Sequence, residues 1–160
     1  MKLSTKNHKE TLALGEKLAK HLKPGDIILL FGDLGAGKTT LTQGLCIGLG
    51  LNKQAYVSSP TFTFMNQYEG IHAINHIDLY RLDTISQIEA LGIEENIFSE
   101  DISIIEWSEK LFVEGNLNNI PRLGIDKRIE IRISIGKENC RGFDIQMINQ
   151  TNRILPVIIQ

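Results

Sequence analysis

The sequence predicts an α/β fold in which helices flank a mixed β-sheet and an antiparallel hairpin lies near the C-terminal end. Two observations support this prediction. The run 27–31, Ile-Ile-Leu-Leu-Phe, is apolar throughout, which is typical of a strand buried on both faces of a parallel sheet; a glycine-rich turn and a helical pattern follow it. Within 128–148, two segments alternate between apolar and polar residues, as the strands of a half-exposed hairpin do.

Periodicity and helix breakers predict the elements around the glycine-rich turn. Leucine and alanine residues recur at helical spacing over 8–22, so we expect an amphipathic helix there, ended by the segment 23–26, Lys-Pro-Gly-Asp. After the turn we expect a second helix over 39–49, which ends at Gly50.

The later elements are shorter. We expect strands at 61–68, 72–77 and 102–106, a helix at 86–91, a loop at 116–124, and a last strand or tail at 155–159. In the strand 128–135, four isoleucines up to Ile135 lie on one face. The other face carries Arg128, Glu130, Arg132 and Ser134, and we expect it to be exposed.

Length and charge restrict the class of protein. The chain is expected to form one domain, 1–160, because it has no repeat or linker. It has no apolar run that could span a membrane and no secretory signal, so we expect a cytoplasmic location. Its 17 basic and 19 acidic residues give a net charge of −2, which argues against a broad nucleic-acid-binding surface. Cys46 and Cys140 form no zinc-binding pattern, and we expect both to be buried thiols.

The segment 32–39, Gly-Asp-Leu-Gly-Ala-Gly-Lys-Thr, matches the phosphate-loop pattern G-x-x-x-x-G-K-[ST] at every fixed position. We expect Lys38 to bridge the outer phosphates of a nucleotide and the Thr39 hydroxyl to bind Mg²⁺. Backbone amides at a helix N-terminus bind phosphate, and those expected here belong to Gly35, Ala36, Gly37, Lys38, Thr39 and Thr40. The predicted fold is therefore P-loop NTPase-like. No guanine-reading Asn-Lys-x-Asp stretch is present, which favours ATP/ADP.

A site of this class also needs a carboxylate for the metal, usually at the end of a strand beside the loop strand. The apolar run 102–105 ends in Glu106, where aspartate is more usual, and Glu106 is our candidate ligand. The alternative is a surface glutamate at a strand end.

A second polar cluster occupies 76–81, His-Ile-Asp-Leu-Tyr-Arg, at the end of another predicted strand. Asp78 can order the attacking water or hold a water on the metal, and Arg81 can pair with a carboxylate or a phosphate. The alternative is a solvated turn between a strand and a helix. For His76 alone we favour a hydrogen-bonded structural role.

Two further features lie near these acids. The segment 58–63 precedes Asp78, and the hydroxyl of Ser59, Thr61 or Thr63 can reach the metal or its waters; a simple Ser-Pro turn is equally compatible. Trp107 directly follows Glu106, and both a position beside the site and packing in the core remain open.

Together these motifs resemble the bacterial TsaE (YjeE) family of small ATPases. The resemblance rests on four segments in a fixed order, 32–40, 59–63, 76–82 and 105–107, and covers about 8–110. It implies a role in forming N6-threonylcarbamoyladenosine at position 37 of tRNAs that read ANN codons. It further implies that the protein joins the TsaD and TsaB proteins, meets tRNA through that complex, and hydrolyses ATP to support repeated turnover.

The resemblance also implies residue roles. Lys38 and Thr39 are expected to hold phosphate and magnesium, Glu106 to complete the metal site, and Asp78 to be needed for hydrolysis. Two further residues are expected to contact the nucleotide: His8 near the N-terminus and an arginine on the late hairpin, for which Arg141 is the best match.

Two other functions use the same loop. One is a small-molecule kinase, although the part of the chain after Trp107 reads as a hairpin and not as a basic helical lid. The other is an assembly factor that binds ATP and rarely cleaves it, against which Glu106 and Asp78 both argue. Because no arginine finger is evident in the chain, we expect slow hydrolysis by the protein alone.

Overall fold

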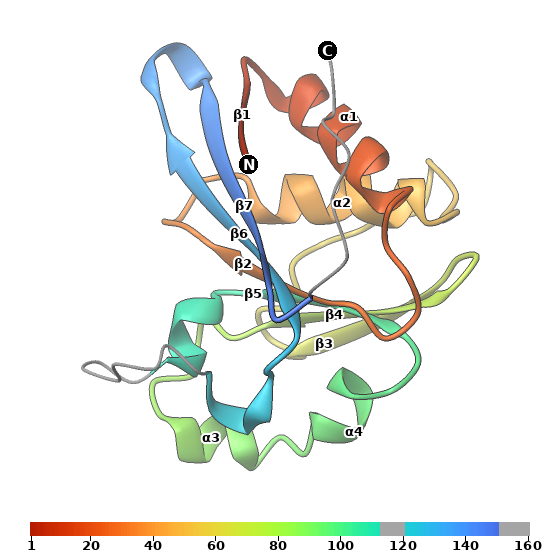
Figure 1. Cartoon of the computed structure of the whole chain (residues 1–160), viewed down its shortest axis with the longest axis vertical. Helices are drawn as coiled ribbons and strands as arrows, with labels where there is room; N and C mark the ends of the chain where they lie inside the picture. The colour runs from red at the N-terminus through yellow and green to blue at the C-terminus, as the bar shows by residue number, and fades with distance from the viewer. Residues whose placement is uncertain (113–120, 151–160) are drawn as a thin grey trace.

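A computed structural model describes residues 1–112 and 121–150, which form a mixed sheet of seven strands with helices on both faces (Figure 1). The strands are β1 (Lys2–Thr5), β2 (Ile27–Phe31), β3 (Met65–Glu69), β4 (Ala73–Asp78), β5 (Ile102–Glu106), β6 (Arg128–Ile135) and β7 (Arg141–Ile148). The helices are α1 (His8–Ala19), α2 (Lys38–Gly48), α3 (Ile85–Glu89) and α4 (Glu94–Ile97), with short 3-10 turns η1 (Ser108–Leu111), η2 (Arg122–Gly124) and η3 (Lys137–Asn139).

The strand order β1-β7-β6-β2-β5-β4-β3 places four parallel strands at the centre of the sheet. Strands β4, β5, β2 and β6 are parallel, whereas β3 and β7 run antiparallel to their neighbours. The carboxyl ends of β2, β4 and β5 therefore meet at one edge, where ligands bind in open α/β sheets. Glu106 is level with Leu30 on one side and with Asp78 on the other.

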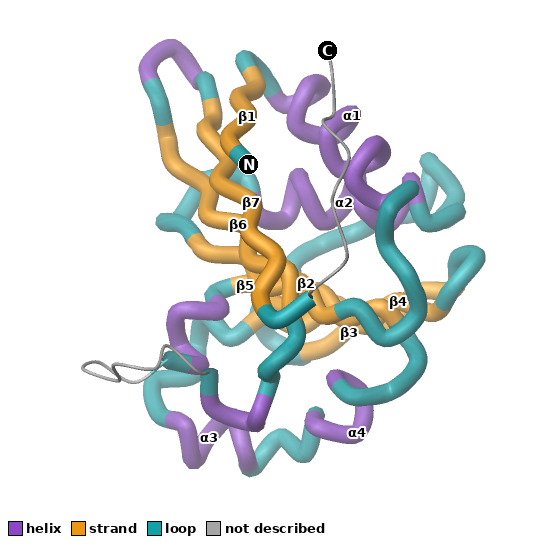
Figure 2. Tube along the Cα trace, in the orientation of Figure 1, coloured by secondary structure: helices purple, strands orange, loops and turns teal. Residues whose placement is uncertain are grey.

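The sheet separates two apolar cores. Helices α1 and α2 cover one face, and α3 and α4 lie on the other (Figure 2). Strand β2 serves both: Ile28 and Leu30 pack toward α1 and α2, whereas Leu29 and Phe31 pack toward the α3 and α4 side. All five residues of β2 are buried, which confirms the prediction for this run.

Two glycines bring α1 and α2 into close contact. A Cβ atom on Gly15 would lie 2.7 Å from the Cα of Gly44, and one on Gly44 would lie 2.2 Å from the carbonyl oxygen of Leu12. Larger side chains would force the helices apart. This contact fixes the direction of α2 and thus the position of its N-terminus.

The predicted α/β fold and the strand 102–106 are confirmed, and several boundaries move. Helix α1 ends at Ala19, before the expected residue 22, because the amides of His21 and Leu22 form tight bonds to carbonyls three residues back. Strand β3 begins at Met65 because 60–64 forms a turn closed by the amide of Phe64 on the carbonyl of Pro60. Residues 116–120 and 155–159 lie outside the described residues.

Among the described residues, β1, α4 and the short turns η1, η2 and η3 were not predicted from the sequence, and η2 lies within the expected loop 116–124. β1 has four residues, too few for an alternating pattern to be evident. It gains its place at the sheet edge from pairing with β7, which begins 136 positions after β1 ends. No described helix is both long and apolar enough to cross a membrane.

The exposed face expected for 128–135 is wrong for its first half. Arg128 and Glu130 are both 2% exposed and form an ion pair of 2.8 Å, and Arg132 also donates to Glu130 at 3.0 Å. Pairing of the two charges makes their burial possible. At the other end, Ile135 was expected on the buried face and is 53% exposed, because β6 extends there beyond the core.

Both cysteines are free. Cys46 is buried as expected, and burial raises the pKa of its thiol to about 12. Cys140 is only half-buried, because it lies in the turn between β6 and β7.

Candidate nucleotide-binding site

The turn between β2 and α2 leaves open space beside its backbone. Gly35 and Gly37 have φ of 76° and 103°, a region that side-chain-bearing residues rarely adopt. A Cβ atom on either would have no other heavy atom within 4 Å. Gly37 caps α2, whose first turn has amides without partners inside the helix. The combination suits an anion held by backbone N–H groups.

Lys38 is the first residue of α2 and is 5% exposed. Its ammonium donates to the carbonyls of Gly32 at 2.5 Å and Asp33 at 3.0 Å, and it lies 3.7 Å from the centre of the Trp107 ring. Burial lowers the pKa of Lys38, and the nearby Glu106 carboxylate opposes this effect. Trp107 therefore lies beside the loop and also packs against the core on the α3 and α4 side, so both positions left open by the sequence apply.

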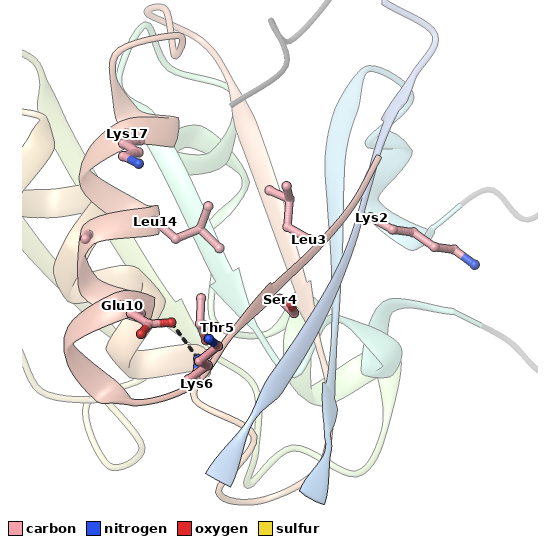
Figure 3. A pocket seen from close by; sticks show the side chains of 9 residues that line it. Lys2, Leu3, Ser4, Thr5, Lys6, Glu10, Leu14 and Lys17 are labelled. Carbon is pink, nitrogen blue, oxygen red and sulfur yellow. Dashed lines mark hydrogen bonds between the residues drawn. The ribbon is translucent and has the colours of Figure 1, made fainter. Parts of the chain in front are cut away.

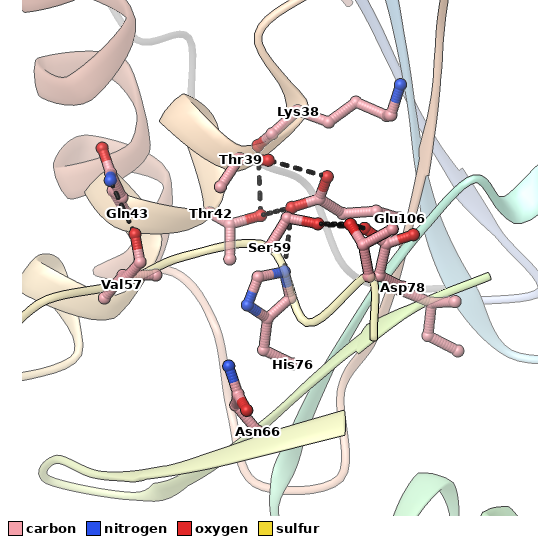
Figure 4. Close-up of polar contacts among 12 residues, drawn as sticks. Lys38, Thr39, Thr42, Gln43, Val57, Ser59, Asn66, His76, Asp78 and Glu106 are labelled. Atoms are coloured by element: carbon pink, nitrogen blue, oxygen red, sulfur yellow. Dashed lines mark hydrogen bonds and ion pairs between the residues drawn. The ribbon is translucent and has the colours of Figure 1, made fainter. Parts of the chain in front are cut away.

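Glu106 is 2% exposed and is held by three side chains (Figure 4). Its Oε2 accepts from the Thr39 hydroxyl at 3.0 Å. Its Oε1 accepts from the Thr42 hydroxyl at 3.3 Å and lies 2.8 Å from His76 Nε2. The alternative of a surface glutamate is wrong, because the carboxylate is buried against the first turns of α2.

Asp78, at the end of β4, binds the segment 58–63. Its Oδ2 accepts from the hydroxyls of Ser59 and Thr61, the latter at 3.0 Å, and its Oδ1 accepts from the backbone amide of Tyr80 at 2.8 Å. Asp78 is 1% exposed. The segment 58–63 and the end of β4 thus form one hydrogen-bonded unit beside Glu106.

These groups line a hollow of about 380 Å³ on one side of the phosphate loop. Its walls come from the loop, the segment 58–63 and the ends of β4 and β5. The lining residues are Leu34, Gly35, Gly37, Lys38, Thr39, Thr40, Ser59, Thr61, Asp78, Tyr80, Glu106 and Trp107.

A second hollow of about 320 Å³ lies on the other side of the loop. Gly35, Gly37 and Thr40 line both hollows, and His8 and Arg141 line only the second. The guanidinium of Arg141 donates to the carbonyls of Ala36 at 2.9 Å and Gly35 at 3.1 Å. The structure therefore brings both His8 and Arg141 to the phosphate loop, where the resemblance placed them.

A larger hollow lies elsewhere, between β1 and α1, and measures about 720 Å³ (Figure 3). Lysines line its polar walls together with Glu10, whose carboxylate is engaged by the amide of Lys6 at 2.7 Å and the side chain of Asn7 at 3.1 Å. No phosphate-loop residue lines this hollow. We therefore place the candidate site at the loop and not here.

The donor groups at the loop fit Mg²⁺. Thr39 Oγ1 and Glu106 Oε2, two oxygen atoms 3.0 Å apart, both line the first hollow. Mg²⁺ takes oxygen ligands and usually binds through one or two carboxylates, waters and substrate phosphates. Among the described residues no group of three or more histidine, cysteine or acidic side chains could hold a metal.

Two further side chains near the site have other partners in the structure. The guanidinium of Arg81 lies over the ring of Phe62, 4.6 Å from its centre. The Thr63 hydroxyl donates to Asn66 Oδ1 at 3.3 Å. A pairing of Arg81 with a carboxylate or a phosphate, and a contact of Thr63 with the metal or its waters, stay predictions. The sequence interpretation also missed Thr42. Its position, four residues after Lys38 on the same helix face, was the available signal.

The chain is also similar to known proteins. A family model described as threonylcarbamoyl adenosine biosynthesis protein TsaE matches residues 5–142. Proteins named tRNA threonylcarbamoyladenosine biosynthesis protein TsaE are similar to the chain. The one from Bacillus subtilis is 40% identical over 80% of this chain and 82% of its own, and the one from Nostoc sp. is 45% identical over 94% and 88%. A crystal structure of YdiB from Bacillus subtilis superposes with a TM-score of 0.72 at 30% identity, covering 92% of this chain and 85% of its own.

Proposed function

The chain belongs to the TsaE family of threonylcarbamoyl adenosine biosynthesis proteins, and we propose that it binds and hydrolyses Mg-ATP to support repeated turnover of a TsaD–TsaB complex. On this proposal the protein acts in the cytoplasm as one ATPase domain and meets tRNA only through its partners. The proposal rests on one observation: Asp78 and Glu106 are register partners on neighbouring strands, beside a complete phosphate loop.

The phosphate loop supplies binding. The amides at the start of α2 take the phosphates, and Lys38 exchanges its carbonyl partners on Gly32 and Asp33 for the β- and γ-phosphates. Thr39 and Glu106 hold Mg²⁺, which, when bound, neutralises charge on the phosphate oxygens. His8 and Arg141 line the hollow that takes the rest of the nucleotide.

Asp78 orients the attacking water. A water held by this carboxylate attacks the γ-phosphorus, the bond to ADP breaks, and phosphate leaves. In the structure the Ser59 and Thr61 hydroxyls bond the same carboxylate oxygen, Oδ2. For water to bind this oxygen, the two hydroxyls must release it or share it. The hydrogen bonds between the segment 58–63 and Asp78 therefore depend on which nucleotide is bound, as they do in switch segments.

Such a change provides a route to the partner. A protein that contacts the segment 58–63 binds one nucleotide state more tightly only if its contacts differ between the two states. Phe62 in this segment is 78% exposed, and Leu34, which lines the first hollow from the phosphate loop, is 73% exposed, so both segments present an apolar side chain to solvent. We expect the TsaD–TsaB pair to distinguish ATP from ADP here.

Reconstitution of tRNA modification with purified TsaD, TsaB, this protein, tRNA and a threonylcarbamoyl donor tests the proposal. Omitting the protein, or replacing it with Lys38→Ala, should reduce repeated turnover and spare the first turnover. Lys110→Ala is the matched control, because this lysine lies outside both hollows and pairs with Asp83. Unaffected turnover, together with phosphorylation of a metabolite in an extract, would establish the kinase function instead.

A further inference from the structure

His76 is a buried histidine at the border of the aliphatic core under α2, and its ring lies 6.2 Å from that of Tyr68. It lies on β4 and faces α2, on the same side as Ile74, and its register partner on β5 is Ile104. Its exposed fraction is 0%. An isoleucine would continue the pattern of this face, so the presence of an imidazole needs an explanation beyond packing.

The two ring nitrogens of His76 have different surroundings. Nε2 lies 2.8 Å from Glu106 Oε1, and because a carboxylate can only accept, Nε2 carries the hydrogen and donates it. Nδ1 is buried and has no hydrogen-bond partner among the described residues. An unpaired buried nitrogen lowers stability. The histidine therefore contributes to the Glu106 contact while leaving its other nitrogen unsatisfied.

Because of the contact with His76, the two carboxylate oxygens of Glu106 have different partners. His76 and Thr42 hold Oε1 from the interior, which directs Oε2 toward the Thr39 hydroxyl at the phosphate loop. We propose that His76 is a positioning residue, which orients Glu106 so that Oε2 is presented to the magnesium site. This inference rests on the proposed function. Hydrogen bonds that orient metal ligands in this way commonly change metal affinity by 10- to 100-fold when removed.

Three substitutions isolate the donated hydrogen bond. His76→Gln keeps an N–H donor at about the reach of Nε2, His76→Asn places its donor too close to the backbone to meet Glu106, and His76→Leu removes the donor. The measurement is the affinity of Mn²⁺, used in place of Mg²⁺, for the ADP complex of the whole protein by electron paramagnetic resonance. We expect His76→Asn and His76→Leu to weaken Mn²⁺ binding about tenfold or more. His76→Gln should stay within about threefold of wild type, and metal-free ADP affinity should not change.

Ile74→Val is the control for packing, because it lies on the same face of β4 and makes no hydrogen bond. If His76→Leu does not fold, the contrast between glutamine and asparagine decides. Equal Mn²⁺ affinities for these two variants, or a loss that Ile74→Val reproduces, would overturn the role of His76 and leave the proposed function standing. If wild-type protein with ADP binds Mn²⁺ no more tightly than ADP in solution does, the magnesium site of the proposed function fails, and the inference fails with it.

Discussion

The two sides of the phosphate loop are built in different ways. The first hollow is lined by acids from the ends of two neighbouring parallel strands and by hydroxyls from α2 and the segment 58–63, with Asp78 and Glu106 in direct register. The second is lined by His8 at the start of α1 and by Arg141 at the start of β7, more than 100 positions apart in the chain. On the proposed function, the first side supplies groups for hydrolysis and the second supplies groups that bind the nucleotide.

This difference teaches that chemistry and affinity can be varied separately here. The two sides share the backbone of Gly35, Gly37 and Thr40, and α2 begins between them. Substitutions on the first side should therefore change turnover with little effect on binding, and substitutions on the second should do the reverse. Lys38 lies on the first side yet binds phosphate, so it should affect both.

Lys38→Ala should have the largest effect. Loss of a charge-assisted contact to the outer phosphates should weaken ATP binding about 100-fold, and hydrolysis should fall at least as much. Equilibrium binding of a fluorescent ATP analogue measures the first quantity, and circular dichroism verifies the fold. Wild-type affinity and turnover in this variant would contradict the phosphate-loop assignment.

Asp78→Asn should separate turnover from binding on the first side. The amide keeps the size of the side chain and can still meet Ser59 and Thr61, but it orients water poorly. We expect ATP affinity within about twofold of wild type and hydrolysis reduced about tenfold or more. Single-turnover kinetics with saturating protein give both values. Equal losses of affinity and rate would show that Asp78 is structural, and the two sides would not be separable.

The first side was predictable from the sequence because local rules determine it. A phosphate loop follows a buried strand, and acids at the ends of apolar runs meet at one sheet edge, so Glu106 and Asp78 could be identified without coordinates. The second side could not be derived in this way. Arg141 reaches Ala36 only because β7 pairs with β6, and β6 pairs with β2. No local sequence pattern predicts these two strand pairings together.

Burial of polar side chains was also beyond local rules. Arg128 and Glu130 alternate with isoleucines as exposed residues do, and only the packing of Ile125 and Phe112 around them shows that they are buried. The sequence correctly indicated that His76 is hydrogen-bonded. It did not identify the partner, Glu106, which lies 30 positions later and on which the proposed positioning role depends. In both cases the missing information was which residues from other parts of the chain pack against the polar side chain.

Arg141→Ala should show the complementary behaviour of the second side. Its guanidinium holds the carbonyls of Gly35 and Ala36 and lines the second hollow, so its loss should raise the KM for ATP about three- to tenfold with kcat unchanged. Arg132→Ala, on the neighbouring strand, is the control, because Arg132 lines neither hollow and pairs with Glu130. A fall in kcat with unchanged KM would mean that Arg141 acts on the reacting phosphate, and the comparison of the two sides would need revision.

The smallest expected effect is a dependence of ATP affinity on pH, which can be measured on the wild-type protein. Burial lowers the pKa of Lys38 from its ordinary value of 10.5, so the ammonium loses its proton at a lower pH than an exposed lysine does. ATP affinity should then fall, by about threefold per pH unit, as pH rises through this lowered pKa. AMP lacks the β- and γ-phosphates that Lys38 is expected to bridge, so its affinity should stay constant across that pH range.

The same shift has the opposite sign for stability. Between the lowered pKa and 10.5, the unfolded chain holds a proton on Lys38 that the folded protein has released. Because the unfolded state then binds more protons, the unfolding free energy of the nucleotide-free protein should rise with pH across this window, relative to Lys38→Met. Thermal unfolding of both proteins from about pH 8 to about pH 10 measures the difference. If ATP affinity and relative stability rose together, Lys38 would not be the group that titrates, and its charge would not be what binds the phosphates.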